Sequence, residues 1–596
     1  MKFSAMLITL RHTQRVPLKR LLLRFRHSLL LKYYGNKCVG EFTGQDDTYL
    51  LECSENFISL ASEIFNVRKD MYLSSYKDIV DGHIKLRGEK RDIGRLEDFD
   101  WSSLVQPCEN DVNWFYELSY LGFLTKVVPD ADESVYELVA TILKSIELEG
   151  RAGDWNKSLA WKPVSCANRL INLSFIIYSG VKSGALASGD LAILMRHGRI
   201  CASLLTKLCE THLHYNHLSF CQVSVFVWNV LVSKGQSVAE LDCIIRTFEE
   251  QLLVDGGQAE RSPTYHIHVL ALARLVSVAG VLDTELQHRI NCVVERMTSA
   301  LSVMTHSDGD IALFNDAALN DAPASSVFVD SSAEAHQTMV LQETGYGQLN
   351  SGSVRVILDG GDPGPADNPG HGHSDYLSIE ISIAGLRFIV DPGCGSYIAG
   401  ALRHKCRSGY VHNGPAFENR DLMELSGAFR VGRYSTANIF KLNDNKEPKG
   451  LIAICHPYFN KNQTLKRMVK EICKGVIVIV DVWEGGDIQV GTCDFLVPEE
   501  WSNSERAVYS LANSRIEVMP LHGGLTITGG HKYWPYGPGQ EQKSNGFSIK
   551  PIKCNQYAAS VVVMSSLDDI TVPIQHIDPK ELIHNVRNFK EGSCEA

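Results

Sequence analysis

Three histidines and two aspartates lie close together in a glycine-rich part of the chain, and side chains of these types bind metals or transfer protons. They are His371, His373, Asp375, Asp391 and His412. Two imidazoles and one carboxylate with an open fourth position form a zinc site, which predicts His373, Asp391 and His412 as ligands. His371 would then face a substrate. Hydrogen-bonded loop histidines are the alternative interpretation, and the spacing leaves both open.

A second group of reactive side chains lies at residues 260–266. Ser262 is a natural N-cap and Pro263 a natural first helical residue, which places Tyr265 in the first turn of a helix. Tyr265 either begins the buried stripe of that helix or places a phenol at the rim of a cleft. In the second case we expect the helix dipole and nearby cations to lower its pKa.

Two further clusters contain side chains of types that can hydrogen-bond a carboxylate or stack on a ring. Asn216 and His217 precede an apolar helix and can hydrogen-bond a carboxylate, although a solvated helix cap fits the same pattern. Trp155, Trp161, Asn168 and Arg169 offer a surface for stacking a sugar ring and a guanidinium fork for a carboxylate. Core and surface positions are the alternative for these four residues.

The elements that must position these residues differ between the two halves of the chain. Only six of the twenty prolines precede Asp330, and none lies between Val164 and Ser262, so long helices can form there. Apolar residues at three- and four-residue spacing predict helices over segments 113–127, 134–148, 164–183, 188–209, 215–233, 237–254, 264–282 and 284–302. Successive helices with short links predict hairpins that close into an α/α toroid or continue as a solenoid.

After about residue 335 the hydrophobic period changes from 3.6 to 2, which predicts an antiparallel β-sandwich. Residues 376–383 alternate polar and apolar, as in a strand with one solvated face, and a turn at Ala384-Gly385 would bring Asp391 beside Ser378. Other strands are predicted at Val354–Leu358, Leu386–Val390, Leu451–Cys455, Gly475–Val482 and Ala558–Met564. The stretch Thr305–Asp330 is interpreted as the interdomain link.

The N-terminal region is basic, since every charged residue before Glu41 is Lys or Arg. This pattern predicts an amphipathic helix packed on an acidic body, with contact to an anionic membrane or an atypical export signal as alternatives. The apolar run Phe3–Leu10 is too short for an ordinary secretory signal. The predicted domains are a basic helical segment and lead-in (1–100), a helical toroid (101–325) and a sandwich (335–596).

Composition restricts the partners. The 596 residues include 58 Lys and Arg against 69 Asp and Glu, so the net charge of −11 argues against nucleic-acid binding. No apolar run reaches the roughly 18 residues of a membrane-spanning helix. The sixteen cysteines form no CxxC pair and are expected as free thiols in a reducing compartment. The pattern does not indicate the number of subunits.

Together these motifs resemble the heparinase II/III-like polysaccharide lyases. The run GHGHSDYLSIEISIAGLRFIVDPG at 370–393, followed by RSGYVHNG, is similar to the family signature, and ERSPTYHIHVLALARL at 260–275 is similar to a second family segment. Trp161–Arg169 and the set Gln463, Arg467 and Asp481 also resemble family landmarks. The resemblance implies an α+β multidomain fold, with an α/α toroid (an incomplete helical barrel) followed by an antiparallel β-sandwich.

The resemblance also implies β-elimination on a uronic-acid polysaccharide, either a glycosaminoglycan such as hyaluronan, chondroitin or heparan, or alginate. Asn216 and His217 would neutralise the substrate carboxylate, and Tyr265 would act as general acid and base, with His371 as a second base. A divalent metal, expected to be zinc with a structural role, would be held by His373, Asp391 and His412. The substrate-binding residues implied are Trp161, Arg169, His266, Tyr397 and Arg407.

Other functions fit parts of the same pattern. A uronate C5-epimerase of this fold would use the same proton abstraction, and a noncatalytic exopolysaccharide-assembly protein would not need Tyr265. A glycoside hydrolase would need two carboxylates, for which Asp316 and Glu260 are candidates. A polymer substrate favours the periplasm or the exterior, whereas the free cysteines favour the cytoplasm.

Overall fold

The computed structural model describes residues 2–27, 57, 59, 76–86, 89–94, 101, 112–125, 133–152, 158–232, 238–330, 338–444, 447–485, 489–503, 507–538, 540–569 and 577–591. Lys32, Trp155 and most of the predicted lead-in lie outside these residues. The chain forms two compact units that do not follow chain order. The sheet unit contains Met1–Arg15, Leu252–Ile267 and Glu295–Ala596, and the helical unit contains Val16–Gln251 and His268–Val294. The predicted domain boundaries stay a prediction.

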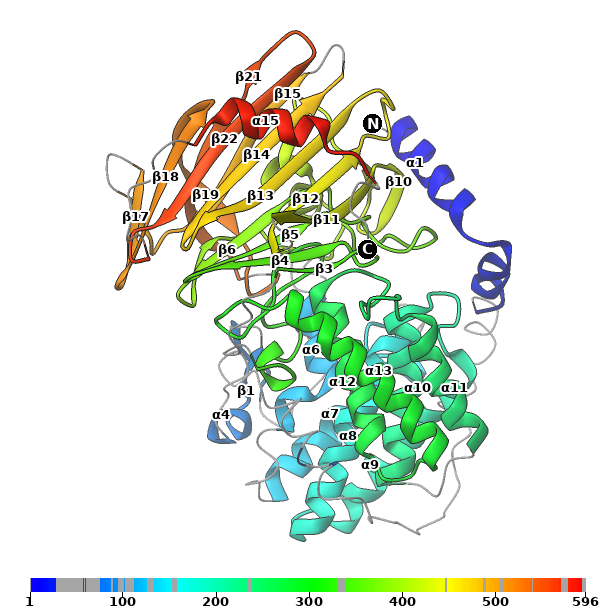
Figure 1. Ribbon diagram of the computed structural model, residues 1–596. Coiled ribbons are helices and arrows are strands. Elements are labelled where there is room, and N and C mark those ends of the chain that lie inside the picture. The colour runs from blue at the N-terminus through cyan, green and yellow to red at the C-terminus, as the bar shows by residue number, and fades with distance from the viewer. Residues whose placement is uncertain are drawn as a thin grey trace. The chain divides into compact units, whose positions relative to one another are not determined.

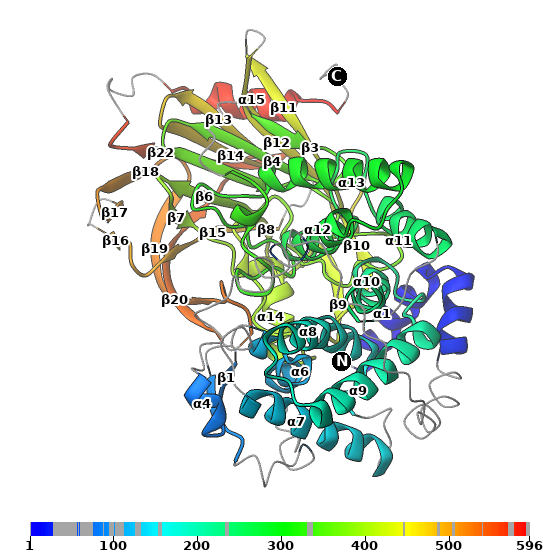
Figure 2. The same ribbon diagram turned by 90° about the horizontal axis from the view of Figure 1, so that it is seen from below.

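The predicted helical segments form helices. They are α6 (Val112–Tyr120), α7 (Glu133–Ala152), α8 (Pro163–Ser183), α9 (Ser188–Leu208), α10 (Tyr215–Leu231), α11 (Val238–Glu250), α12 (Pro263–Val278) and α13 (Thr284–Val303). Figure 2 shows α8 beside α9 and α10, which it contacts. Helix α6 ends before residue 127 because Leu121 adopts a left-handed backbone (φ 61°) and a 3-10 turn follows at Gly122–Leu124. Smaller elements are α4 (Tyr76–Val80), β1 (His83–Leu86) and β2 (Glu89–Asp92).

Antiparallel sheets make up most of the sheet unit (Figure 1). A nine-stranded sheet contains β11 (Thr436–Asp444), β12 (Glu447–His456), β13 (Thr464–Cys473), β14 (Val476–Glu484), β22 (Tyr557–Ser566), β18 (Ser514–His522), β17 (Val508–Leu511), β16 (Ser502–Asn503) and β21 (Ile552–Lys553). A five-stranded sheet contains β3 (Met339–Leu341), β4 (Tyr346–Ser351), β5 (Val354–Asp359), β6 (Ile379–Ile383) and β7 (Leu386–Ile389). A four-stranded sheet contains β19 (Gly524–Tyr533), β20 (Gln542–Lys550), β15 (Val490–Pro498) and β8 (Pro415–Phe417). A two-stranded ribbon pairs β9 (Met423–Ser426) with β10 (Arg430–Tyr434).

The larger sheets share one apolar core, as a sandwich requires. Val356 of β5, Ile479 of β14 and Phe547 of β20 belong to the same buried cluster. On its other face the nine-stranded sheet is covered by α15 (Pro579–Asn588), whose Ile583 and Val586 pack on β14 and β22 (Figure 1). Both faces of the central strands are therefore buried.

The strand β6 corrects one expectation. Its hairpin with β7 turns at Ala384-Gly385 as predicted, and the Ser378 hydroxyl donates to Asp391 at 3.1 Å. Its polar face is buried, however, not solvated. Glu380 and Ser382 are fully buried, and His306 compensates for the loss of water by hydrogen-bonding to them at 2.9 and 3.1 Å.

The stretch 305–330, interpreted as a link, is also different from expectation. It belongs to the sheet unit, and its central residues, including Leu313, Phe314 and Asp316, are buried. Its Asp, Ala and Ser residues suit a closely packed segment because small side chains let the backbone approach its neighbours. The segment is therefore part of the core that surrounds His371.

Two helices form the described N-terminal region. Helix α1 (Lys2–Arg15) packs against β9 and β10 in the sheet unit, and a second helix over residues 18–27 follows Pro17 and belongs to the helical unit. In the described part of the chain, no helix is long and apolar enough to cross a membrane. The cysteines whose side chains are described are free thiols.

Candidate functional site

Tyr265 and His371 come from separate motifs and lie side by side in the sheet unit. Their ring centroids are 3.9 Å apart and their planes are inclined by 35°. Tyr265 lies in the first turn of α12, which begins at Pro263 as predicted, with the Ser262 hydroxyl 3.5 Å from its backbone N–H. His371 lies in the loop between β5 and β6, and 11% of its side chain is exposed. A phenol and an imidazole are thus available at one place.

Carboxylates hold both nitrogens of the His371 ring. Nδ1 lies 2.9 Å from Oδ2 of Asp316, and Nε2 lies 3.5 Å from Oε1 of Glu260. The backbone N–H of Asp316 also donates to the carbonyl oxygen of His371 at 3.0 Å. These contacts fix the orientation of the imidazole beside Tyr265.

Asp316 is fully buried and accepts hydrogen bonds from several side chains. Nε2 of His373 lies 2.8 Å from Oδ1, and Arg403 donates to both carboxylate oxygens, with Nη2 2.8 Å from Oδ2. Burial opposes ionisation, but the charge of Arg403 and the hydrogen bonds from His371 and His373 hold the pKa of Asp316 well below its usual range. Asp316 is therefore a buried anion, which argues against the hydrolase alternative because a general acid needs a raised pKa.

A neighbouring group of buried side chains has the composition of a metal site. His373, Asp375 and His412 each offer a ligand atom, and these atoms lie within 4.8 Å of one another. Nδ1 of His373 and Nε2 of His412 are buried and make no hydrogen bond. Buried polar atoms are normally satisfied, so two open ring nitrogens beside a carboxylate fit a divalent cation.

Burial and the nearby carboxylates determine the protonation of this group. Burial lowers the pKa of His373 to about 4, which keeps the imidazole neutral at pH 7, and raises the pKa of Asp375 to about 6. Burial also opposes a charge on His412, but the negative charge of Asp391 outweighs it and raises the His412 pKa. Metals bind the deprotonated form of each ligand, and a bound cation favours that form.

Asp391, which the sequence predicts as a ligand, contacts the other nitrogen of His412. Its carboxylate oxygens lie 2.9 and 3.1 Å from Nδ1 of that ring. Carboxylates often orient metal-binding histidines in this way. The carboxylate grouped with the two open nitrogens is Asp375, which the sequence interpretation did not select although it stands two residues after His373.

The sandwich fixes the loop that carries His412. The Asn413 amide donates to the carbonyl oxygens of Ile379 and Val390 at 3.0 and 2.9 Å, and its own oxygen accepts from the backbone of β15. Arg467 is buried in a pair with Asp481, at 2.7 and 2.9 Å, and donates to the carbonyl of Asn413. The motif residues Arg467 and Asp481 therefore position the segment that follows His412.

The environment of Tyr265 raises its pKa, opposite to the expected direction. Burial has the largest effect, and the negative charges of Asp316 and Glu260 add to it, while a hydrogen bond with Tyr397 acts in the opposite sense. The helix dipole is too weak to reverse these effects. The phenol therefore keeps its proton at neutral pH.

Two of the residues predicted to bind substrate lie close to this pair. Tyr397 is partly exposed, hydrogen-bonds to Tyr265 and lies 3.3 Å from Asp321. Arg407 is fully buried and donates to the carbonyl oxygen of Gly372 at 2.9 Å, so it supports the histidine loop from inside. Of the two, Tyr397 has surface available to a sugar.

His266 follows Tyr265 but points into the protein. It is buried, Nε2 donates to the Met297 carbonyl at 2.8 Å, and Nδ1 accepts from the Gln258 backbone N–H at 3.2 Å. Burial lowers its pKa to about 4. These contacts make His266 a neutral structural residue at the start of α12.

Asn216 and His217 belong to the helical unit and begin α10. Asn216 is buried, whereas 32% of the His217 side chain is exposed, with Nδ1 2.9 Å from Oε2 of Glu210. The residue before Asn216, Tyr215, has a left-handed backbone with φ 49°, which marks a tight entry into the helix. Their predicted role beside Tyr265 stays a prediction.

Trp161 and Arg169 are buried in the helical unit, so neither presents a surface to solvent. Nε1 of Trp161 donates to the Ile146 carbonyl at 3.1 Å. Arg169 donates to the carbonyls of Ser119 and Ala160 at 3.0 and 2.8 Å and to His197 at 3.0 Å. These contacts place both side chains in the helical core.

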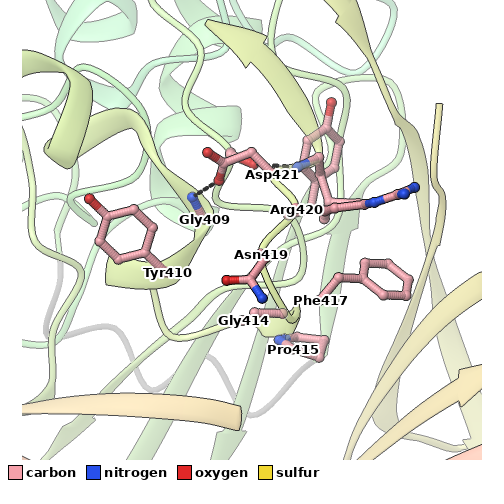
Figure 3. A pocket seen from close by; sticks show the side chains of 12 residues that line it. Gly409, Tyr410, Gly414, Pro415, Phe417, Asn419, Arg420 and Asp421 are labelled. Carbon is pink, nitrogen blue, oxygen red and sulfur yellow. Dashed lines mark hydrogen bonds between the residues drawn. The ribbon is translucent and has the colours of Figure 1, made fainter. Parts of the chain in front are cut away.

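A cavity of about 360 Å³ borders the histidine loop in the sheet unit (Figure 3). It is lined by Ser374, Tyr376, Gly409, Tyr410, Gly414, Pro415, Ala416, Phe417, Asn419, Arg420, Asp421 and Leu422. The Asp421 carboxylate accepts from the Gly409 N–H at 2.6 Å across its upper part. Because Ser374 and Gly414 flank the candidate metal ligands in sequence, this cavity lies beside the loops that hold them.

The sequence interpretation did not assign three important side chains to this site. Arg403 was not considered, Asp375 was not assigned as a ligand, and Asp316 was considered only for the hydrolase. Asp375 had a usable signal, since it belongs to the histidine motif. Asp316 and Arg403 had none, because they meet His371 through contacts between distant parts of the chain.

Comparisons with known proteins agree with this architecture. Residues 335–492 match the family described as heparinase II/III-like, C-terminal. A solved heparinase III is similar at 13% identity, with a TM-score of 0.59, covering 92% of this chain and 90% of that one. The solved structure of a heparan sulfate lyase HepC mutant from Pedobacter heparinus is similar at 15% identity, with a TM-score of 0.53, covering 91% and 88%. No curated protein matches this chain.

At these identities the likeness establishes the fold. The predicted class, an N-terminal α/α toroid followed by a C-terminal antiparallel β-sandwich, is confirmed. The signature residues around His371 and His412 fall inside the matched family region.

Proposed function

We propose that this chain, whose residues 335–492 match the heparinase II/III-like, C-terminal family, is a lyase that cleaves uronic-acid polysaccharides by β-elimination. The observation that carries the proposal is the pairing of Tyr265 with His371, whose ring centroids are 3.9 Å apart. A proton donor and a proton acceptor at one place are what this reaction requires.

The reaction removes the proton at C5 of a uronate and breaks the bond between C4 and the glycosidic oxygen. The electron pair of the C5–H bond forms the C4–C5 double bond, and the departing oxygen takes up a proton. The C5 proton is weakly acidic until the carboxylate is neutralised and the developing enediolate is stabilised. The site must therefore supply a base, an acid and a group that binds the carboxylate.

The protonated phenol of Tyr265 is the general acid in this proposal. Burial and the charges of Asp316 and Glu260 raise its pKa, so the phenol is protonated before the reaction, and its proton passes to the leaving oxygen as the bond from C4 breaks. His371 is the base on the sheet side, held by Asp316 through Nδ1 at 2.9 Å. Tyr265 becomes a base only after its proton has left.

Asn216 and His217 are proposed to neutralise the substrate carboxylate. The exposed edge of His217 is oriented by Glu210, whose carboxylate lies 2.9 Å from Nδ1. Burial opposes the charge of Glu210, but the neighbouring His217 lowers its pKa, so Glu210 is an anion beside this ring. His217 is also proposed as an acceptor of the C5 proton, with His371 as the base for substrates of the opposite C5 configuration.

A divalent metal, with zinc as the choice that suits two imidazoles and a carboxylate, would be held by His373, His412 and Asp375. Asp391 would orient His412 from its other nitrogen. When bound, the metal supplies a fixed positive charge that orders the loop before and after Gly372. We propose a structural role for it, since His371 is the residue of that loop directed toward Tyr265.

The proposed substrates are glycosaminoglycan backbones (hyaluronan, chondroitin or heparan) and alginate. The similar solved proteins are a heparinase III and a heparan sulfate lyase, which favours heparan for the first assay. The full chain is incubated with each polymer, and the unsaturated uronate is measured by its ultraviolet absorbance. Product from at least one polymer is expected, whereas intact polymers throughout would reject lyase activity.

A C5-epimerase is the second candidate, because the same abstraction of the C5 proton, without departure of the leaving group, can end with a proton returned to the other face. Running the same incubation in deuterated water separates the two. Deuterium at C5 without chain cleavage identifies the epimerase, and cleavage identifies the lyase. If neither deuterium incorporation nor cleavage is detected, the noncatalytic assembly role remains.

A further inference from the structure

The helix over residues 18–27 turns its apolar side chains toward solvent. Leu18, Leu22 and Phe25 are 71%, 60% and 66% exposed. Their spacing of four and three residues places them on one face of the helix. Lys19 and Arg26 are also exposed and stand beside this stripe.

The opposite face of the same helix packs basic and aromatic groups against the helical unit. The Arg20 guanidinium lies over the Tyr215 ring at 5.1 Å, and the rings of His27 and His212 are 4.4 Å apart. A surface helix normally buries its apolar face, so this orientation is reversed. Burying the stripe of Leu18, Leu22 and Phe25 against an apolar partner would be favourable, because these side chains are still exposed to water in the folded chain.

Helix α1 repeats the pattern on the sheet unit. Arg11 pairs with Glu424, and Arg15 lies 4.2 Å from the centre of the Tyr434 ring. Met6 and Leu10, one turn apart, are 70% and 53% exposed. Both described N-terminal helices therefore use cations to attach to the protein and leave apolar side chains outside.

The charge of the N-terminal segment indicates which kind of partner covers the apolar faces of these two helices. Every charged residue before Glu41 is Lys or Arg, whereas the whole chain carries −11. An anionic surface would repel most of this protein and attract this segment. Because no described helix can span a membrane, the helices would lie in the plane of the lipid interface, with apolar side chains inserted and cations at the headgroups.

We propose that the apolar face of the helix over residues 18–27 is a surface that binds anionic lipid membranes, and that α1, on the other unit, presents a separate face of the same kind. The apolar stripes supply insertion and the flanking cations supply selectivity for negative headgroups. This surface does not depend on the proposed lyase activity, since it contains none of the residues assigned to the reaction. Binding should weaken as salt concentration rises, because exposed charges are screened.

Vesicle sedimentation of the full chain tests the proposal. Vesicles of phosphatidylcholine with a minor fraction of phosphatidylglycerol are expected to bind it at least about tenfold better than pure phosphatidylcholine. The triple change Leu18→Ser, Leu22→Ser and Phe25→Ser should reduce binding about tenfold or more. Replacing Lys19 and Arg26 by Gln should reduce it about fivefold for each cation.

Because α1 belongs to the other unit, Met6→Ser with Leu10→Ser is measured separately and should also weaken binding. Val238→Ser with Val254→Ser is the matched control, since both side chains are exposed elsewhere and should leave binding unchanged. Equal sedimentation with both vesicle types, or none with either, would overturn the proposal. So would self-association in solution that the triple variant abolishes, because the stripe would then be an interface between copies of this chain.

Discussion

One carboxylate connects the candidate base to the candidate metal site: Oδ2 of Asp316 lies 2.9 Å from Nδ1 of His371, and Oδ1 of Asp316 lies 2.8 Å from Nε2 of His373. Arg403 neutralises this carboxylate inside the protein. The position of the His371 ring is thus coupled to the residues around it through a single buried anion.

Replacing Asp316 by Asn should reduce kcat about 10–100-fold with a smaller effect on KM, because Asp316 orients His371 and does not contact substrate. The free energy of unfolding should also fall by about 3–5 kcal/mol, since the buried Arg403 loses its anionic partner. Steady-state kinetics and urea unfolding measure the two effects. If adding Arg403→Met to the Asn variant restored activity together with stability, orientation of His371 would not be the function of Asp316.

Tyr265→Phe removes the acidic proton and keeps the ring, so kcat should fall about 10²–10⁴-fold while the fold is retained. The assay is formation of unsaturated product, and circular dichroism monitors the fold. Tyr536→Phe is a matched control, because this exposed tyrosine is not part of the proposed site. Full activity in the Tyr265 variant would remove the phenol from the mechanism and favour the noncatalytic role.

Elemental analysis of the purified chain should find a divalent metal, which His373→Ala, His412→Ala and Asp375→Asn each abolish because each removes a ligand. Asp391→Asn should weaken affinity about 10–100-fold, as expected for a residue that orients a ligand. Titration with zinc against a coloured chelator measures this difference.

His404→Ala serves as the metal control, since His404 is exposed and outside the ligand cluster. Metal retained in the Asp375 variant and lost in the Asp391 variant would reverse the assignment of the two carboxylates. A wild-type chain without any divalent metal would leave the open nitrogens of His373 and His412 unexplained.

Gly372→Ala should disturb the histidine loop, because a β-carbon at this position would lie 2.3 Å from the backbone oxygen of Pro363. We expect lower activity and weaker metal binding, with a loss of about 1–3 kcal/mol in the free energy of unfolding. Gly189→Ala is the control, since a β-carbon there meets no atom within 4 Å. An active, metal-replete Gly372 variant would show that the loop tolerates displacement.

His266 predicts a pH dependence of stability. Burial lowers its pKa to about 4, whereas an unfolded histidine titrates near 6.5. As pH falls from about 6.5 to 4, His266 binds a proton in the unfolded chain but stays neutral in the folded chain. His266 therefore makes its full contribution to the free energy of unfolding above about pH 6.5. This contribution falls by about 3 kcal/mol in total as the pH is lowered to about 4.

Urea unfolding between pH 7 and 4.5 measures this loss in the wild type and in His266→Gln. The Gln variant should be less stable at pH 7, because it loses one of the two hydrogen bonds, but it should lose less on acidification. If the wild type and the Gln variant lose the same free energy of unfolding on acidification, the pH dependence comes from other groups.

Local sequence patterns predicted the elements because their causes are local. The periodicity of apolar residues predicted α8 as 164–183 and β14 as 475–482, close to the observed Pro163–Ser183 and Val476–Glu484. Ser262 and Pro263 predicted the start of α12, since a cap and a first-turn proline act within a few residues.

Burial was predicted less well. The polar face of β6 was expected in water but is covered, and His306 hydrogen-bonds to Glu380 and Ser382. His306 lies more than seventy residues away in the chain, so no window of sequence around β6 contains that information. The same limit applies to the buried segment 305–330.

The amino-acid sequence was sufficient for the class of fold, for the position of Tyr265 in the first turn of its helix, and for the chemistry that a phenol and imidazoles can perform. The partnership of Asp316 with His371 and Arg403, the distinction between Asp375 and Asp391, and the direction of the Tyr265 pKa shift came from the folded chain. Each of these depends on burial and on charges contributed by remote segments. Such quantities arise only when packing brings those segments together.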